Sequence, residues 1–333
     1  MNAVFAFICT FIAGAIKQGT PLLFGSTGEI LTEKSGNLNL GIPGIMYMGG
    51  VSGVIGAFFY EKAMGEAPLN PVLGVLIPFV CALIGASLLS LIYCFLTTTL
   101  RANQNVTGLA LTTFGVGIGD FFGGSLAQLF GEGGSLSVRK TSYLFKTTPA
   151  FAKDWGPIGE LLFSYGFLIY LAIILAVIAA WVLSKTRLGL NLRAVGENAA
   201  TADAMGINVT AYKYGATIIG GAIAGLGGLY YIMDYAFGTW SSGSFGDRGW
   251  LAIALVIFAL WKPSMAIAGS FIFGALYVLP PKLQFGENRA AQYAVMMLPY
   301  VVTLVVLIIT SMRKKREHQP PASLGLPYFR EER

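Results

Sequence analysis

Three carboxylates stand in or beside long apolar stretches of this 333-residue sequence, at Glu29, Asp120 and Asp234. A carboxylate at membrane depth is costly, so it indicates a charged partner, a polar pathway or contact with water at the membrane surface. Glu29 and Asp234 fall near the ends of their apolar runs, where interfacial water explains them as well as function does. Asp120 lies between glycine pairs and is the better functional candidate, as a pathway residue or as one paired with a neighbour.

Residues for most other chemistry are missing. The only histidine is His318, near the end of the chain, so the apolar part offers no histidine triad, metal cluster or proton relay. Residues 36–41 have the first spacing of a phosphate loop, but Ile42 and Pro43 follow where Lys and Ser or Thr are needed. Three cysteines, inside apolar runs, are typical of buried thiols: Cys9, Cys81 and Cys94. We expect this chain to bind no metal or cofactor and to draw energy from elsewhere.

The composition indicates the surroundings of these residues. Apolar residues make up 55% and charged residues 11% of the chain, against roughly 25% charged in soluble domains. Glycine, at 43 residues, suits helices that approach closely in a membrane. The net charge of +6 has no soluble basic domain to present it, which excludes nucleic acid as a partner. We therefore predict an all-α polytopic membrane bundle in lipid over residues 1–312, with a flexible tail at 313–333.

The apolar runs predict nine or ten crossings. The clearest are residues 165–183, 214–233 and 290–312, and residues 70–100 and 35–60 are expected to cross as well. Residues 3–31, interrupted by polar residues at 17–21, and residues 103–130 are expected to be helices broken by Gly or Pro. Such breaks at membrane depth are tolerated only where the backbone is buried in protein or lines a polar path. Residues 249–261 and 264–280, separated by Lys262 and Pro263, form two short spans or a hairpin.

Basic residues indicate the orientation. Arg313–Arg316 directly follow the last span, and residues 185–213 are a second basic stretch. Four crossings separate the two stretches, so both can lie in the cytoplasm. The C-terminus is then cytoplasmic, and residues 139–160 lie outside even though several of them are basic.

Residues 196–207 read as a short helix in the cytoplasmic stretch. Asn198 can cap its start, alanines run from Ala199 to Ala204, and Gly206 can end it in a left-handed turn. The small side chains suit either a slim helix that enters a groove on another protein or an interfacial connecting helix.

Four segments, spread over most of the chain, resemble the permease subunits of ATP-driven importers for branched-chain amino acids, simple sugars and nucleosides. Residues 196–200, followed by Gly206 and Ile207, resemble the coupling helix of that family. The other three segments are similar to its nucleoside and simple-sugar branch: residues 31–46, 103–112 and 248–263.

The resemblance implies a subunit of a bacterial cytoplasmic membrane importer that carries nucleosides. A second permease would complete the pathway, two ATPase subunits would hold ATP and Mg, and an extracytoplasmic binding protein would deliver the substrate. The residues that would contact the ATPase are Gly196, Glu197, Asn198, Ala199, Ala200, Ala204, Gly206 and Ile207.

The pathway candidates are polar and aromatic, because a nucleoside offers a base to stack and hydroxyls to bond. They are Asn37, Asn39, Asn103, Gln104, Asn105, Thr107, Thr112, Phe114 and Asp120. The alternatives are a simple-sugar importer, an ion-coupled transporter, for which only Asp120 offers a coupling site, and a membrane enzyme, for which no catalytic constellation is present.

Overall fold

A computed structural model describes residues 3–130, 133–147, 161, 163–283, 289–313 and 319–330. Several residues of the sequence argument lie outside the described residues: Lys153, Glu160, Lys314, Lys315, Arg316 and His318.

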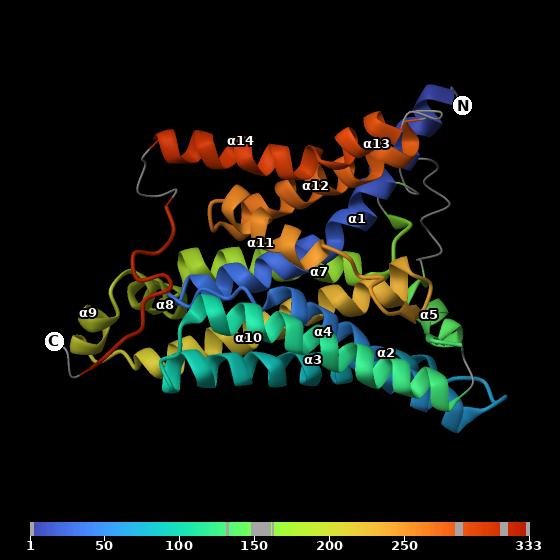
Figure 1. Cartoon of the computed structure of the whole chain (residues 1–333), viewed down its shortest axis with the longest axis horizontal. Coiled ribbons are helices and arrows are strands. Elements are labelled where there is room, and N and C mark those ends of the chain that lie inside the picture. Colours follow the sequence, from blue (N-terminus) through green and yellow to red (C-terminus); the bar gives the residue numbers. More distant parts are fainter. Residues whose placement is uncertain are drawn as a thin grey trace.

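The described part of the chain is a bundle of helices (Figure 1). The long helices are α1 (Ala3–Glu33), α2 (Ile42–Met64), α3 (Pro71–Cys94), α4 (Gln104–Leu129), α7 (Phe167–Lys185), α10 (Val209–Tyr230), α12 (Pro263–Lys282) and α14 (Leu298–Arg313). The shorter helices are α5 (Arg139–Phe145), α8 (Arg187–Glu197), α9 (Ala199–Ala204), α11 (Arg248–Phe258) and α13 (Arg289–Met296). The π-helical turns η1 (Phe95–Thr99) and η3 (Tyr231–Tyr235) extend α3 and α10.

The predicted class, an all-α polytopic membrane bundle, is confirmed. Seven helices of the described residues are long and apolar enough to cross a membrane, or eight if the pair α13 and α14 is counted as one span. The pair is bent by 44°, so the run expected as one clean span at 290–312 has a break at Met297. Helix α11 is too short to be included, whereas α12 reaches spanning length without it.

Close helix contacts depend on glycine. A Cβ on Gly28 of α1 would lie 2.1 Å from the carbonyl oxygen of Gly220 on α10. A Cβ on Gly49 of α2 would lie 2.5 Å from the Cα of Gly225. Both distances are shorter than any tolerated carbon contact, so only glycine permits these crossings. Helix α10 thus packs directly on both α1 and α2.

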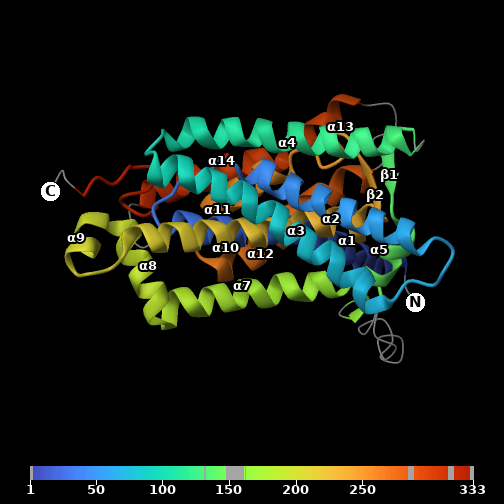
Figure 2. The ribbon, with the colours of Figure 1, turned by 90° about the horizontal axis from the view of Figure 1, so that it is seen from below.

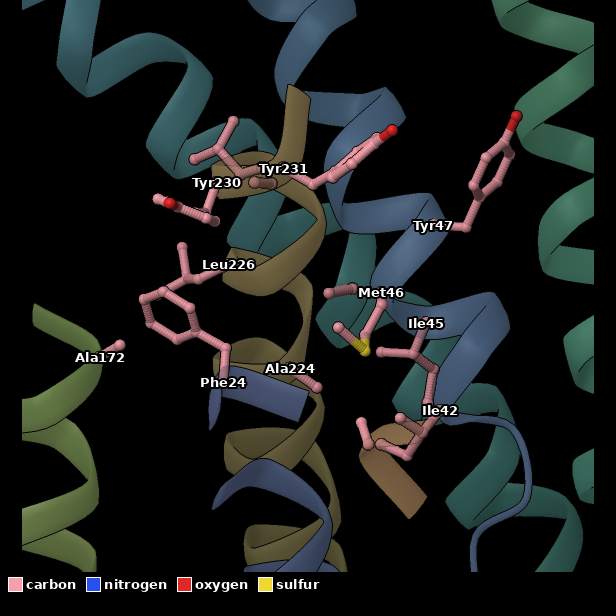
Figure 3. Packing of buried hydrophobic residues seen from close by; sticks show 14 of the residues in the cluster. Phe24, Ile42, Ile45, Met46, Tyr47, Ala172, Ala224, Leu226, Tyr230 and Tyr231 are labelled. Carbon is pink, nitrogen blue, oxygen red and sulfur yellow. The ribbon is translucent and has the colours of Figure 1, made fainter. Parts of the chain in front are cut away.

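Apolar side chains fill the space around these crossings (Figure 3). Phe24 of α1 and Leu226 of α10 point toward Ala172 of α7, and Met46 of α2 lies on the other side of α10. All four side chains are buried.

Helix α1 is continuous, so the expected break at residues 17–21 is wrong. Pro21 has no N–H to donate to the carbonyl of Lys17, which would leave that oxygen unpaired inside a helix. The hydroxyl of Tyr230 donates to the Lys17 oxygen at 3.1 Å and replaces the missing bond. Helix α4 is likewise a single helix, because its glycines contact neighbouring elements: Gly115 approaches Gly44 and Gly123 approaches Trp240.

The two ends of the bundle carry different structures (Figure 2). At one end, β1 (Ser135–Ser137) and β2 (Thr239–Ser241) pair as an antiparallel ribbon beside α5, with Leu136 opposite Trp240. At the other end lie α8, α9 and the C-terminal segment of residues 319–330 (Figure 1). We call these the ribbon end and the α9 end.

Candidate functional site

Helix α9 begins and ends where local rules place it. The side chain of Asn198 accepts a hydrogen bond from the N–H of Thr201 at 2.9 Å and caps the first turn. Gly206 follows the helix with a φ of +81°, a conformation that glycine adopts at little cost. The predicted cap and the predicted left-handed turn are both confirmed.

Helix α9 has one buried and one exposed face. Ala199 and Ala202 pack against Val195 and Val209 in a small apolar cluster, separate from the main core. Ala200 and Ala204 are exposed, as is Met205, at 78%. The outward face therefore consists of small side chains, next to one methionine, that leave room for another surface to approach.

Helix α8 joins α9 to the turn after α1. Gly196 is buried, and a Cβ on it would lie 2.3 Å from the carbonyl oxygen of Lys34. Burial lowers the pKa of the Lys34 ammonium, and the nearby charges of Glu197, which raises it, and Arg193, which lowers it further, also act on it. A movement of α8 would therefore be passed to residue 34 by direct backbone contact.

The C-terminal segment is anchored to the same place. The N–H of Ser323 donates to the Gly196 oxygen at 2.9 Å, and the N–H of Gly325 donates to the Gly36 oxygen at 3.1 Å. Tyr328 donates to Asp203 at 2.8 Å, and the Arg330 Nε lies 3.1 Å from the same carboxylate. Within the expected tail, residues 319–330 are therefore bonded to α8, to α9 and to the turn after α1.

The loop between α1 and α2 is buried, and side chains satisfy its backbone. Glu29 accepts from the N–H of Asn39 at 3.2 Å, and Gln104 accepts from the N–H of Leu38 at 2.6 Å. Thr112 donates to the Leu40 oxygen at 2.8 Å. Buried loops require such partners, since water cannot reach them. The loop thereby joins α1 to α4.

The two carboxylates for which interfacial water and function were left as equal alternatives are both buried. Glu29 has no exposed surface, and Asp234 is 6% exposed. For Glu29 the reason is the loop: its carboxylate turns inward to bond the Asn39 amide. Asp234 lies in η3, which contacts β2 and α5.

Several amide and carboxylate atoms around the loop have no hydrogen-bond partner among the described residues. They are Glu29 Oε2, Asn37 Oδ1, Asn39 Nδ2 and Gln104 Nε2. The side-chain nitrogen of Asn37, Nδ2, donates to the hydroxyl of Thr217 at 3.1 Å. This part of the bundle holds unsaturated hydrogen-bonding capacity, which suits a region that rearranges.

The predicted pathway residues fall into two groups. Asn37, Asn39, Gln104 and Thr112 gather at the buried loop, with Thr107 buried nearby on α4. A second group is exposed on the outer surface of the bundle, on α4 or at its start: Asn103, Asn105 and Phe114.

Asp120 belongs to neither group. It accepts a hydrogen bond from Tyr47 of α2 and is partly exposed. Of the two readings left open for it, the structure shows the paired one, and a polar contact with a pathway on its exposed side is still compatible with that pairing.

Some site residues escaped the sequence argument. Glu33 accepts a hydrogen bond from the indole N–H of Trp261, and this links α1 to the connection between α11 and α12. The spacing of Glu29 and Glu33, one helical turn apart in an apolar helix, was a usable signal. The tail contacts of Tyr328 and Arg330 had no signal, because nothing local to residues 319–330 predicts which surface they bind. No three His, Cys, Asp or Glu side chains of the described ranges come together as metal ligands do.

Known membrane transport proteins are similar to this chain over most of its length. Residues 11–309 match the family model described as branched-chain amino acid transport system, permease component. The nucleoside ABC transporter permease NupC of Lactococcus lactis subsp. cremoris is 33% identical over 90% of this chain and 91% of its own length. TsgC13 of Haloferax volcanii, named provisionally as a glucose ABC transporter permease, is 31% identical over 90% of this chain and 86% of its own. The guanosine ABC transporter permease NupQ of Bacillus subtilis is 28% identical over 97% of both. The chain belongs to the family of permease components of branched-chain amino acid transport systems.

Proposed function

We propose that this chain is a transmembrane subunit of an ATP-driven importer for nucleosides. The permease family makes it a transport subunit, and two of the relatives described above carry nucleoside or guanosine in their names. The observation that carries the proposal is α9, a short capped helix with a small-residue outer face at one end of the bundle. ATP and Mg are held by separate ATPase subunits, and this chain supplies no nucleotide site of its own.

The α9 end faces the cytoplasm in this proposal. The ATPase receives the exposed face of α9 in a groove, where Ala200 and Ala204 permit close approach. When the ATPase subunits close on ATP, α9 moves with them. Because α8 touches Lys34 through Gly196, the movement continues into the loop between α1 and α2.

The loop converts that movement into a change of the helices. Its backbone is bonded to Glu29 of α1, to Gln104 and Thr112 of α4, and to Tyr93 of α3. A displaced loop thus shifts α4 relative to α1, and the atoms without partners in the buried group can take up new hydrogen bonds. The switch between inward and outward openings follows.

The pathway lies along the outer side of α4, where a second permease completes it. Asn105 and Phe114 are exposed on this helix and offer an amide and an aromatic ring. A base can stack on the ring while ribose hydroxyls bond the amide, each interaction being weak enough to let the substrate leave. An extracytoplasmic binding protein delivers the substrate at the ribbon end, and the whole assembly lies in the cytoplasmic membrane of a bacterium.

Uptake of labelled nucleosides tests the proposal. Cells that lack the native chain receive the intact chain, Ala200→Arg, or the matched control Ala200→Ser, and unlabelled ribose and branched-chain amino acids are added as competitors. We expect uptake with the intact chain and with Ala200→Ser, none with Ala200→Arg, and no competition. Competition by ribose would indicate that the substrate is a sugar and not a nucleoside. Transport by the purified chain alone in liposomes would show that it is not a subunit of an ATP-driven importer.

A further inference from the structure

A polar cavity of about 510 Å³ lies at the α9 end, beside the helix proposed to meet the ATPase. Its walls come from four segments: η1 with Arg101 after it, the end of α9 with the turn that follows, the first turn of α10, and the C-terminal segment. Cavities of this size accommodate small organic ligands. Tyr328 and Arg330 of the C-terminal segment line it, so that segment is part of the cavity as well as a strap on α9.

One wall holds a buried cation without a partner. Lys213 of α10 lines the cavity and is 3% exposed, yet no side chain or backbone oxygen of the described residues forms a hydrogen bond or ion pair with its ammonium. A buried ammonium is costly unless an opposite charge meets it. The cavity is therefore the place from which a counter-charge would come.

The first turn of α10 adds donors to the same cavity. Val209 and Thr210 line it, and as the first two residues of a 22-residue helix their N–H groups have no acceptor within the helix. The Asn208 side chain accepts a hydrogen bond from the N–H of Ala211 at 3.0 Å. This cap does not bind the N–H groups of Val209 and Thr210. A helix N-terminus favours an anion.

Positively charged side chains outnumber negatively charged ones around the cavity, which also favours an anion. Arg101, Lys213 and Arg330 line it, against Asp203 as the acidic residue of the wall, and Arg330 and Asp203 already pair with each other. Arg101 has a left-handed backbone with a φ of +59° and lies two residues after the end of the π-helical turn η1. Both features are uncommon for such residues and occur preferentially at functional sites.

We propose that this cavity binds a phosphate group, carried by a small soluble phosphate ester or by a phospholipid headgroup. A phosphate group offers one or two negative charges and several acceptor oxygens, which Lys213, Arg101 and the α10 N-terminus can bind together. A bound phosphate holds α10, η1 and the C-terminal segment together. Since Tyr328 and Arg330 also hold Asp203 of α9, occupancy fixes the position of α9.

Binding is measured on the purified full chain in phosphatidylcholine nanodiscs. Labelled inorganic phosphate and labelled adenosine monophosphate are the soluble probes, and equilibrium dialysis gives their dissociation constants. In a second arm the nanodiscs contain equal phosphatidylcholine and phosphatidylglycerol, and native mass spectrometry counts the phosphatidylglycerol that stays bound. The test variant is Lys213→Met, and the matched control is Lys185→Met, an exposed lysine at the same end that does not line the cavity.

The proposal expects at least one probe to bind, with affinity about tenfold or more weaker in Lys213→Met and unchanged in Lys185→Met, since a charge-assisted contact to phosphate is lost. Loss confined to the soluble probes assigns a phosphate ester, and loss confined to retained phosphatidylglycerol assigns a lipid headgroup. If Lys213→Met does not fold, Arg101→Gly, which suits the positive φ, and Arg330→Gln must each weaken binding. Equal binding by the intact chain and the cavity variants, or no binding of any probe, would overturn the proposal.

Discussion

The two ends of the bundle close it in opposite ways. At the ribbon end the largest side chain points inward: Trp240 of β2 is 1% exposed, and its ring lies against Gly123 of α4. At the α9 end the smallest side chains point outward, because Ala200 and Ala204 are exposed while only a small separate cluster lies beneath α9.

The ribbon end is thus built for stability, and the α9 end is built to contact another protein. The ribbon end is stabilised by the burial of a large aromatic ring between β2 and α4. The α9 end has few buried contacts of its own and is held by hydrogen bonds from the C-terminal segment. A surface that meets and moves with another protein needs that combination of local order and an open, small-residue face.

The largest effect is expected from a bulky charge on the open face. Ala200→Arg should reduce nucleoside uptake to background while the protein still inserts, because a guanidinium would occupy the space in which the ATPase approaches. Uptake per amount of membrane-inserted chain, determined by quantitative immunoblot, is the measurement. Uptake near that of Ala200→Ser would show that the exposed face of α9 is not the surface that contacts the ATPase.

At the ribbon end a stability effect is expected without loss of function per molecule. Trp240→Ala should lower the free energy of unfolding by about 3–5 kcal/mol, since it empties a fully buried site. The thermal denaturation midpoint of the purified chain measures it, with Trp181→Ala, 59% exposed on α7, as the control. A midpoint shift equal to that of the control would show that the ribbon end is not closed by this ring.

A smaller effect is expected where α8 meets the α1–α2 loop. Gly196→Val should destabilise the chain by about 1–3 kcal/mol, because its side chain would collide with the Lys34 carbonyl. Nucleoside uptake should fall further than stability alone explains, since the link between α9 and the loop is displaced. Gly215→Val serves as control, because a Cβ there meets nothing within 4 Å. Similar results for both variants would contradict the proposed link.

The smallest effect is expected from the strap itself. Asp203→Asn should cost less than about 1 kcal/mol of stability, because Arg330 is 73% exposed and exposed ion pairs contribute little. Limited proteolysis should nevertheless cut residues 319–330 several times faster than in the intact chain. Asp247→Asn, at the start of α11 and outside the contacts of the C-terminal segment, should leave that rate unchanged. Equal cutting rates in the two variants would show that Asp203 does not hold this segment.

The sequence predicted correctly those features that depend only on neighbouring residues. The cap at Asn198 and the turn at Gly206 need only the neighbouring backbone, and both were predicted correctly. The high glycine content also indicated helices that approach closely, and Gly49 forms such a contact with Gly225.

Predictions failed where distant residues decide. The break expected near Pro21 is repaired by Tyr230, more than 200 positions away, and the inward turn of Glu29 depends on a loop that folds back onto it. The contacts of residues 319–330 with Asp203 and Gly196 were likewise not predicted. None of these contacts leaves a periodic or local signature in the sequence.

Cross-linking at the two ends tests the central claim most directly. In a chain with Cys9, Cys81 and Cys94 replaced by alanine, Ala200→Cys on α9 and Tyr143→Cys on α5 each place one thiol on an exposed position, with Tyr143 78% exposed. A short thiol-to-amine cross-linker is applied to membranes that contain the assembled transporter, and the product is probed for the ATPase subunit. We predict a cross-link to the ATPase from Ala200→Cys and none from Tyr143→Cys. A cross-link from Tyr143→Cys alone, or none from Ala200→Cys, would contradict the assignment of the α9 end as the ATPase-docking surface.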